Sequence, residues 1–277
     1  MRPHRSLHPR LSRLLPALMC AALAFLFPGV AHAAGAATNG VPTMQDIPAL
    51  EMTDPDLAAT RAWLAADLFP CASLDARKKA LVHLVTLAAT QACEGMEAEV
   101  AAALDAGASP LDIREALYQC APYAGFPRAE AALRRANAAF AARGVALPLE
   151  SAATVTETTR FADGLAVQKG IFGDAIDAMH ASCPAGQEPI IVRALSAFCF
   201  GDTYTRSHLD LKERELLTFA IIAALGGCEP QVKAHAQGNA SVGNTRQELV
   251  DALAVMLPDI GFPRALNALA CVNAVMK

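Results

Sequence analysis

The sequence has few aromatic residues and little charge. Phe, Tyr and Trp make up 5% of the 277 residues, charged residues make up 18%, and the net charge is -4. Without a basic excess there is no electrostatic reason to bind nucleic acid, so we expect no nucleic-acid partner. No stretch alternates apolar and polar residues as a half-buried strand would. Scarce aromatics and abundant alanine favour close-packed helices over a β-sandwich, so we predict an all-α protein.

The N-terminus has the pattern of a secretory signal peptide. A positive segment with four arginines precedes an apolar run from Leu14 to Val30, and Ala31-His32-Ala33 fits the rule for a cleavage site. The alternative is a membrane anchor, but a run of about 17 residues is at the bottom of the spanning range. We expect residues 1–33 to be removed, which predicts a periplasmic or secreted protein with no membrane segment after cleavage.

The segment that follows, residues 34–56, is rich in Ala, Gly, Pro and Thr without periodicity, and we interpret it as a flexible leader. Of the eight cysteines, Cys20 lies in the signal peptide, which leaves seven in the mature chain. An oxidising compartment permits disulfides. An odd number leaves at least one thiol unpaired or paired between chains. The seven are Cys71, Cys93, Cys120, Cys183, Cys199, Cys228 and Cys271.

The chain contains an internal duplication. The segment AGFPRA at Ala124–Ala129 recurs as IGFPRA at Ile260–Ala265, an offset of 136. Upstream, Leu74-Asp75 and Cys93-Glu94 recur at an offset of 135 as Leu209-Asp210 and Cys228-Glu229. Ordered matches over such a span predict two tandem units, which we place at residues 57–148 and 155–277.

Each unit has helical start and stop signals. Residues 80–92 and 213–225 are apolar nearly all round, as in buried helices. Asp210 with Glu213, and Thr245 with Glu248, form capping boxes, and Gly226-Gly227 ends the first of these helices. We therefore expect each unit to be a helical hairpin with flanking helices.

The second copy resembles the carboxymuconolactone decarboxylase family. The likeness covers residues 160–277 well and 57–145 more weakly, through the duplication. It is carried by Phe200 to Leu216, the Gly-Gly turn, His235, Gly243, Thr245, Glu248 and the Gly261-Phe-Pro263 turn.

This resemblance implies an all-α oligomer, with a trimer favoured for a two-module chain. It also implies one of two chemistries without a bound cofactor. Decarboxylases of the family remove CO2 from a carboxylated lactone by acid–base catalysis. The related alkylhydroperoxidase D branch reduces peroxides with a Cys-x-x-Cys pair, a preceding Glu and a following His. The substrate is accordingly a hydroperoxide or a small carboxylic acid or lactone.

Three residues are candidate catalytic groups. Cys228 stands just before Pro230 at a predicted helix start, where free amides and the helix dipole stabilise a thiolate, although free cysteines are often simply buried. His235 falls at the family's histidine position and is suited to general acid–base catalysis. Glu215 falls near the family's acidic position. In a simple helical hairpin Glu215 would not lie level with His235. The Cα atom of Glu215 would be roughly 16 Å from the turn along its helix, and that of His235 roughly 8 Å.

Three further residues are candidate substrate contacts. Gln231 shares a helix face with His235, four residues on. Arg206 and Arg214 could bind a carboxylate, the alternative being surface salt bridges. Cys228 and His235 lack a second ligand pair with zinc spacing, so we predict no metal.

Departures from the family pattern leave the function open. Residue 231 is Gln where a second cysteine would stand, so Cys228 would need Cys199, Cys271 or an external thiol to resolve it. The first copy has Ala80 in place of Glu215 and is expected to be structural. We expect a thiol-dependent peroxidase or oxidoreductase, which export favours. The alternatives are a decarboxylase, which Glu215 and His235 favour, and a non-catalytic oligomer or ligand binder.

Overall fold

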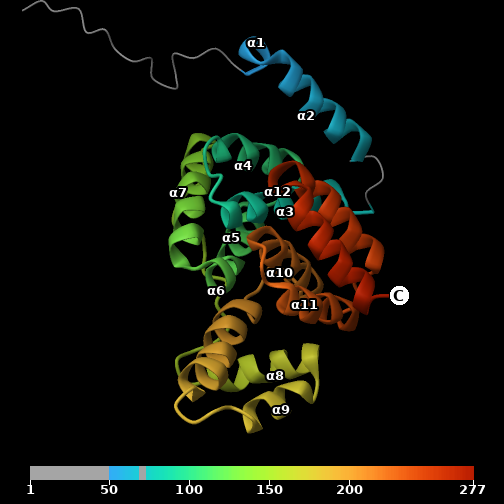
Figure 1. Ribbon diagram of the computed structural model, residues 1–277. Coiled ribbons are helices and arrows are strands. Elements are labelled where there is room, and N and C mark those ends of the chain that lie inside the picture. The colour runs from blue at the N-terminus through green and yellow to red at the C-terminus, as the bar shows by residue number, and fades with distance from the viewer. Residues whose placement is uncertain (1–49, 69–72) are drawn as a thin grey trace, which may run out of the picture. The chain divides into compact units, whose positions relative to one another are not determined.

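The computed structural model describes residues 50–68 and 73–277, and within these ranges every regular element is a helix (Figure 1). The all-α prediction is therefore confirmed. Across the same ranges we find no helix with the length and apolar character needed to cross a membrane. The predicted signal peptide, residues 34–49 of the leader, and Cys71 lie outside the described residues.

The last residues of the expected leader are helical rather than irregular. Helix α1 spans Leu50–Thr53, and α2 begins at Pro55 and ends at Leu68. Pro55 suits a first helical position because an N–H there would have no partner within the helix. The negative charge of Asp56 in the first turn interacts favourably with the positive end of the helix dipole.

The first copy folds into a series of helices whose starts follow the sequence signals. The Asp75 carboxylate accepts the Lys78 amide at the first of them, and Ser109 with Asp112 forms a complete capping box. The helices are α3 Ala76–Thr90, α4 Met96–Asp105, α5 Pro110–Gln119, α6 Ala121–Ala124 and α7 Phe126–Ala142.

The second copy repeats this order after an additional group of helices. Asp210 and Glu213 cap α10, Thr245 and Glu248 cap α12, and α12 bends where Gly261 leaves helical geometry. One element, η3, is a π-helix, a form usually limited to single turns and frequent at functional sites. The elements are α8 Arg160–Phe172, α9 Ala175–Ala181, η3 Pro189–Tyr204, α10 Leu211–Leu225, α11 Glu229–Ser241 and α12 Arg246–Val275.

The two copies share one hydrophobic core. Helices α3 and α10, the two predicted buried helices, pack against each other, and α12 packs on both (Figure 1). Residues from both copies, such as Leu84 and Phe219, are almost fully excluded from solvent in the same cluster. A smaller cluster forms where η3 and α8 pack together, and it includes Ile171, Cys199, Phe200 and Tyr204. The candidate site lies where this small cluster meets α10 and α11.

Candidate active site

A buried glutamate–histidine pair joins α10 to α11. Nδ1 of His235 lies 3.0 Å from Oε2 and 3.3 Å from Oε1 of Glu215. The Glu215 side chain is fully buried, and His235 is 8% exposed. Asn239 fixes the register of the two helices, because its amide donates to the backbone oxygens of Glu215 and His235. A carboxylate only accepts hydrogen bonds, so Nδ1 donates to it, and Nε2 makes no hydrogen bond to a described residue.

The structure thus brings Glu215 and His235 together, although their positions along a simple helical hairpin predicted that they would not meet. Asn239 lies level with Glu215, and His235 lies one turn nearer the Gly-Gly connection. The counting compared Cα heights only. A height difference of roughly 8 Å is within the combined reach of an extended glutamate and an imidazole ring.

Donors from several elements hold the Glu215 carboxylate in place. The Tyr204 hydroxyl donates to Oε1 over 2.6 Å, and it also lies 2.7 Å from the Thr218 hydroxyl. Tyr123 donates to the Tyr204 oxygen over 3.2 Å. Burial, with the charge of Glu215 among the further causes, holds the pKa of both phenols well above the usual range. Both tyrosines therefore remain protonated donors.

The first copy contributes to this site and is not merely a packing partner. Tyr123 belongs to α6, and Gln119 of α5 donates to Thr218 over 2.9 Å. Tyr123 also packs edge-on against His235, with ring centroids 5.5 Å apart. Sequence reasoning missed Tyr123. The available signal was its place two residues before the repeated Gly-Phe-Pro turn, where the second copy has Asp259.

The equivalent place in the first copy holds a different polar cluster. With the offsets of 135 and 136, His83, Glu99 and Asp259 correspond to Thr218, His235 and Tyr123. His83 Nδ1 lies 3.4 Å from Glu99, and its Nε2 lies 3.2 Å from Asp259. The duplicated position has therefore become an ion cluster that links α3 to α12.

A cavity of about 610 Å³ lies beside the pair, and His235 forms part of its wall. Tyr123, Cys199, Cys228, Gln168 and Gln231 supply its other polar groups. The wall is otherwise apolar, and α8, α9 and η3 provide most of it. These apolar residues include Phe172, Ile176, Met179, Ile190, Leu195, Phe198, Phe200, Ile222 and Leu225.

Cys228 lines the same cavity as His235. It stands at the cap position of α11, and its thiol donates to the Gly226 carbonyl over 3.3 Å. No disulfide joins the described cysteines. Cys199 also lines the cavity, but burial raises the pKa of its thiol to about 12 and it donates to Tyr123. Cys271 does not line it and donates to the Glu229 carbonyl.

Of the candidate substrate contacts, only Gln231 lies on the cavity, where it is exposed. Arg214 is fully buried and, together with Arg206, binds the carboxylate of Glu115. Burial raises the pKa of Glu115, but the hydrogen bonds and charges of the arginines lower it by more. The prediction that these arginines bind substrate thus finds no support, because both are committed to a buried ion cluster.

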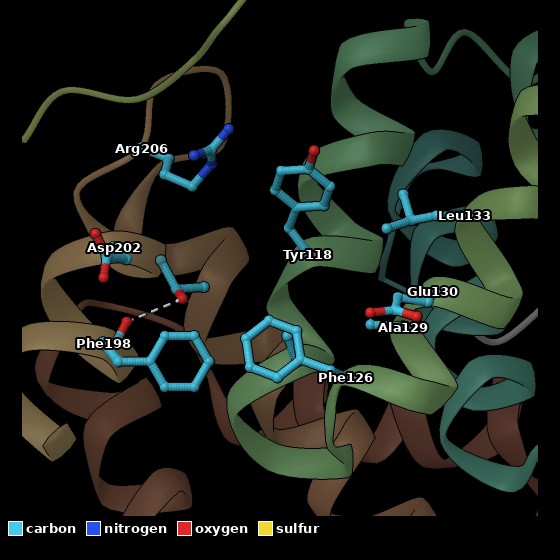
Figure 2. Close-up of a pocket in the computed structure, with 10 residues that line it drawn as sticks. Tyr118, Phe126, Ala129, Glu130, Leu133, Phe198, Asp202 and Arg206 are labelled. Carbon is cyan, nitrogen blue, oxygen red and sulfur yellow. Dashed lines mark hydrogen bonds between the residues drawn. The ribbon is translucent and has the colours of Figure 1, made fainter.

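A second, smaller cavity of about 270 Å³ shares Phe198 with the first as a lining residue. Figure 2 shows Arg206 at its edge and Phe126 facing Phe198. The guanidinium of Arg206 lies 4.8 Å from the centre of the Tyr118 ring. Its remaining bonds go to Glu115, so it is not a free anion-binding group there.

Across residues 50–68 and 73–277, no group of three His, Cys, Asp or Glu side chains is arranged to hold a metal ion. What the arrangement supplies is a histidine oriented by a carboxylate, next to an apolar cavity that also contains a thiol.

Comparison with known proteins supports the predicted duplication. No curated protein matches the chain. Two separate stretches, residues 51–138 and 189–274, match the family model described as the carboxymuconolactone decarboxylase family. Glu215, Cys228 and His235 lie in the second stretch, whereas α8 and α9 lie between the two. The matches cover more than half of the chain and agree with two tandem modules, and the protein therefore belongs to the carboxymuconolactone decarboxylase family.

Proposed function

We propose that the protein is a cofactor-free acid–base enzyme that decarboxylates a small organic acid bearing a carbonyl group, such as a carboxylated lactone. The observation that carries this proposal is the buried Glu215–His235 pair beside an apolar cavity. Such a pair is the usual arrangement of a general acid or base and the group that orients it.

In this reaction the bond between a carbon and its carboxylate breaks and CO2 leaves. The electron pair moves through the adjacent carbon onto the carbonyl oxygen and forms an enolate. A proton delivered by the His235 imidazolium to the carbon that carried the carboxylate completes the product, and water then returns a proton to His235 and leaves hydroxide. Glu215 stabilises the imidazolium that carries the proton, because its carboxylate accepts from Nδ1.

The walls of the cavity favour loss of charge. None of the described residues that line it is Arg or Lys. A carboxylate held against Phe172, Leu195 and Ile222 would be poorly solvated, whereas CO2 is neutral. Arg206 and Arg214 do not offset this cost because both bind Glu115.

A second candidate is reduction of an organic hydroperoxide by Cys228, because this thiol and His235 line one cavity. The thiolate would attack the peroxide oxygen, the O–O bond would break, and an alcohol would leave with a proton while Cys228 becomes a sulfenic acid. An external thiol would then reduce the sulfenic acid. Gln231 at the second-cysteine position and the bond from Cys228 to Gly226 argue against this candidate.

The two candidates separate with matched variants. CO2 release from a carboxymuconolactone, and consumption of cumene hydroperoxide with dithiothreitol, would be measured for wild type, His235→Gln and Cys228→Ser. Decarboxylation predicts CO2 release that falls by about 10²–10⁴-fold in His235→Gln and persists in Cys228→Ser. Peroxide consumption lost in Cys228→Ser would support the second candidate instead. A wild-type protein inactive in both assays would refute the proposed function.

We also propose that the mature chain begins at Ala34, is exported, and assembles as a trimer. The N-terminal pattern of arginines, apolar run and Ala31-His32-Ala33 supports export, and family resemblance supports the trimer. Intact mass of the protein from a periplasmic extract, followed by light scattering after size exclusion, tests both. A retained N-terminus or a monomer would contradict the respective proposal.

A further inference from the structure

One polar side chain on the cavity wall has an unused hydrogen-bond donor. Gln168 of α8 is 1% exposed and lines the cavity. Its amide oxygen accepts the Ser196 hydroxyl over 2.7 Å. Its amide nitrogen makes no hydrogen bond to any residue that the structure describes, and it is not among the fully enclosed polar atoms that lack a partner. The nitrogen therefore retains access to the cavity.

The other donors of the wall are engaged or open to solvent. Tyr123 donates to Tyr204, Cys199 to Tyr123, and Cys228 to Gly226. The Nδ1 donor of His235 goes to Glu215, and in the proposed function its Nε2 delivers the proton to the reacting carbon. Gln231 is exposed, so water satisfies its amide. Gln168 is thus the one buried side-chain amide on the described wall whose donor is left for a ligand.

The packing of α8 on η3 fixes the position of Gln168. A Cβ at Gly164, one turn earlier on α8, would lie 2.0 Å from the Ser196 backbone oxygen and 2.4 Å from the Gly201 nitrogen. Only glycine allows the helices to approach this closely. The approach places the Ser196 hydroxyl against the amide oxygen of Gln168, which turns the amide nitrogen away from Ser196.

We propose that the amide nitrogen of Gln168 donates to the carbonyl oxygen of a ligand whose apolar remainder fills the 610 Å³ cavity. The ligand class is a lactone or ketone with an apolar substituent. A buried donor without a partner is costly, so a cavity with this donor selects ligands that carry an acceptor. This inference rests on the proposed function for one point only: in decarboxylation the same donor would stabilise the enolate oxygen.

Two probes with the same ring framework test the donor. γ-Phenyl-γ-butyrolactone and cyclopentylbenzene differ only in the ring oxygen and the carbonyl group. Dissociation constants would be measured by ligand-observed NMR on the aromatic protons. Without a donor, the hydrocarbon should bind more tightly because it is the more apolar ligand. The proposal expects wild-type protein to bind the lactone at least as tightly as the hydrocarbon.

Variants then assign the donor. Gln168→Leu should weaken lactone binding by about fivefold or more and leave hydrocarbon binding within about twofold. Gln168→Glu, which replaces the donor by an acceptor, should weaken lactone binding as well. Gln231→Leu is the matched control for the other cavity amide. Thermal unfolding followed by circular dichroism verifies folding, and the wild-type comparison of the two probes stands even where a variant does not fold.

The outcomes distinguish this inference from the proposed function. Lactone binding that depends on Gln168 in a protein without turnover would support the inference and leave the function refuted. Turnover that disappears in His235→Gln, with lactone binding unchanged in Gln168→Leu, would overturn the inference alone. Loss of lactone binding in Gln231→Leu but not in Gln168→Leu, or a wild-type preference for the hydrocarbon, would also overturn it.

Discussion

Replacing Gly238 by alanine should disrupt the Glu215–His235 pair from a position that contacts no ligand. Gly238 lies on α11, one turn after His235. A Cβ there would lie 2.5 Å from Oε2 of Glu215, closer than real Cβ contacts, and 3.1 Å from Ile171 and Phe172. The carboxylate therefore has to move, and Oε2 is the atom that accepts from His235 over 3.0 Å.

The expected cost follows from the bonds that this movement breaks. A hydrogen bond to a charged group contributes about 1.5–3 kcal/mol. Alanine offsets part of the loss, because it favours a helix over glycine by about 0.5–1 kcal/mol. We therefore expect Gly238→Ala to lower the free energy of unfolding by roughly 1–2 kcal/mol and to lose most of the activity that depends on His235.

Gly170→Ala is the matched control. Gly170 is an exposed residue of α8, and a Cβ there would meet nothing within 4 Å. The same substitution should thus be neutral or stabilise the protein by up to about 1 kcal/mol. Urea unfolding measures both variants, and ¹⁵N NMR of the imidazole reports the Nδ1 bond. If Gly238→Ala is as stable as Gly170→Ala and its His235 spectrum is unchanged, the reasoning is refuted.

Three further predictions follow from the buried charges and thiols. Glu115→Leu should destabilise the fold by about 3–5 kcal/mol in urea unfolding, because it leaves the fully buried Arg214 unpaired; a loss below 1 kcal/mol would contradict this. Burial lowers the pKa of His83, but the hydrogen bond and charge of Asp259 and the charge of Glu99 together raise it by more, so the net pKa is raised. The stabilisation from His83 should then be present below about pH 6.5 and lost as pH rises through the raised pKa. If the difference in free energy of unfolding between wild type and His83→Gln instead grows as pH rises, the prediction is wrong. Cys199, whose pKa is about 12, should resist iodoacetamide at pH 8 until the protein unfolds, as mass mapping would show; rapid labelling of folded protein would oppose this.

The helices were predictable because their signals are local. Asp210 and Glu213 cap α10 through bonds within one turn, and Gly226 ends it, so a short window of sequence contains the whole cause. The same holds for Thr245 and Glu248 of α12. The duplication was equally accessible, since it needs only a comparison of the chain with itself.

The site was only partly predictable because it depends on contacts far apart in the chain. Glu215 and His235 were named by resemblance and Cys228 by its place at a helix start, but the distance between Glu215 and His235 depends on how α10 packs against α11. Tyr123 reaches the site from the first copy, and its place before the repeated Gly-Phe-Pro turn marks the position but not the contact. Gln168 escaped notice because its unused donor appears only once the partners of the whole wall are known.

Part of the cavity wall comes from a segment of the chain that does not contain the catalytic pair. Helices α8 and α9, residues 160–181, supply Gln168, Phe172, Ile176 and Met179 and lie between the two stretches that match the family. Glu215 and His235 lie within the second stretch. Substitutions in 160–181 can therefore change which molecule is accepted without altering the groups that move protons. Exchange of this one segment between related proteins is a direct route to new substrate preference on unchanged chemistry.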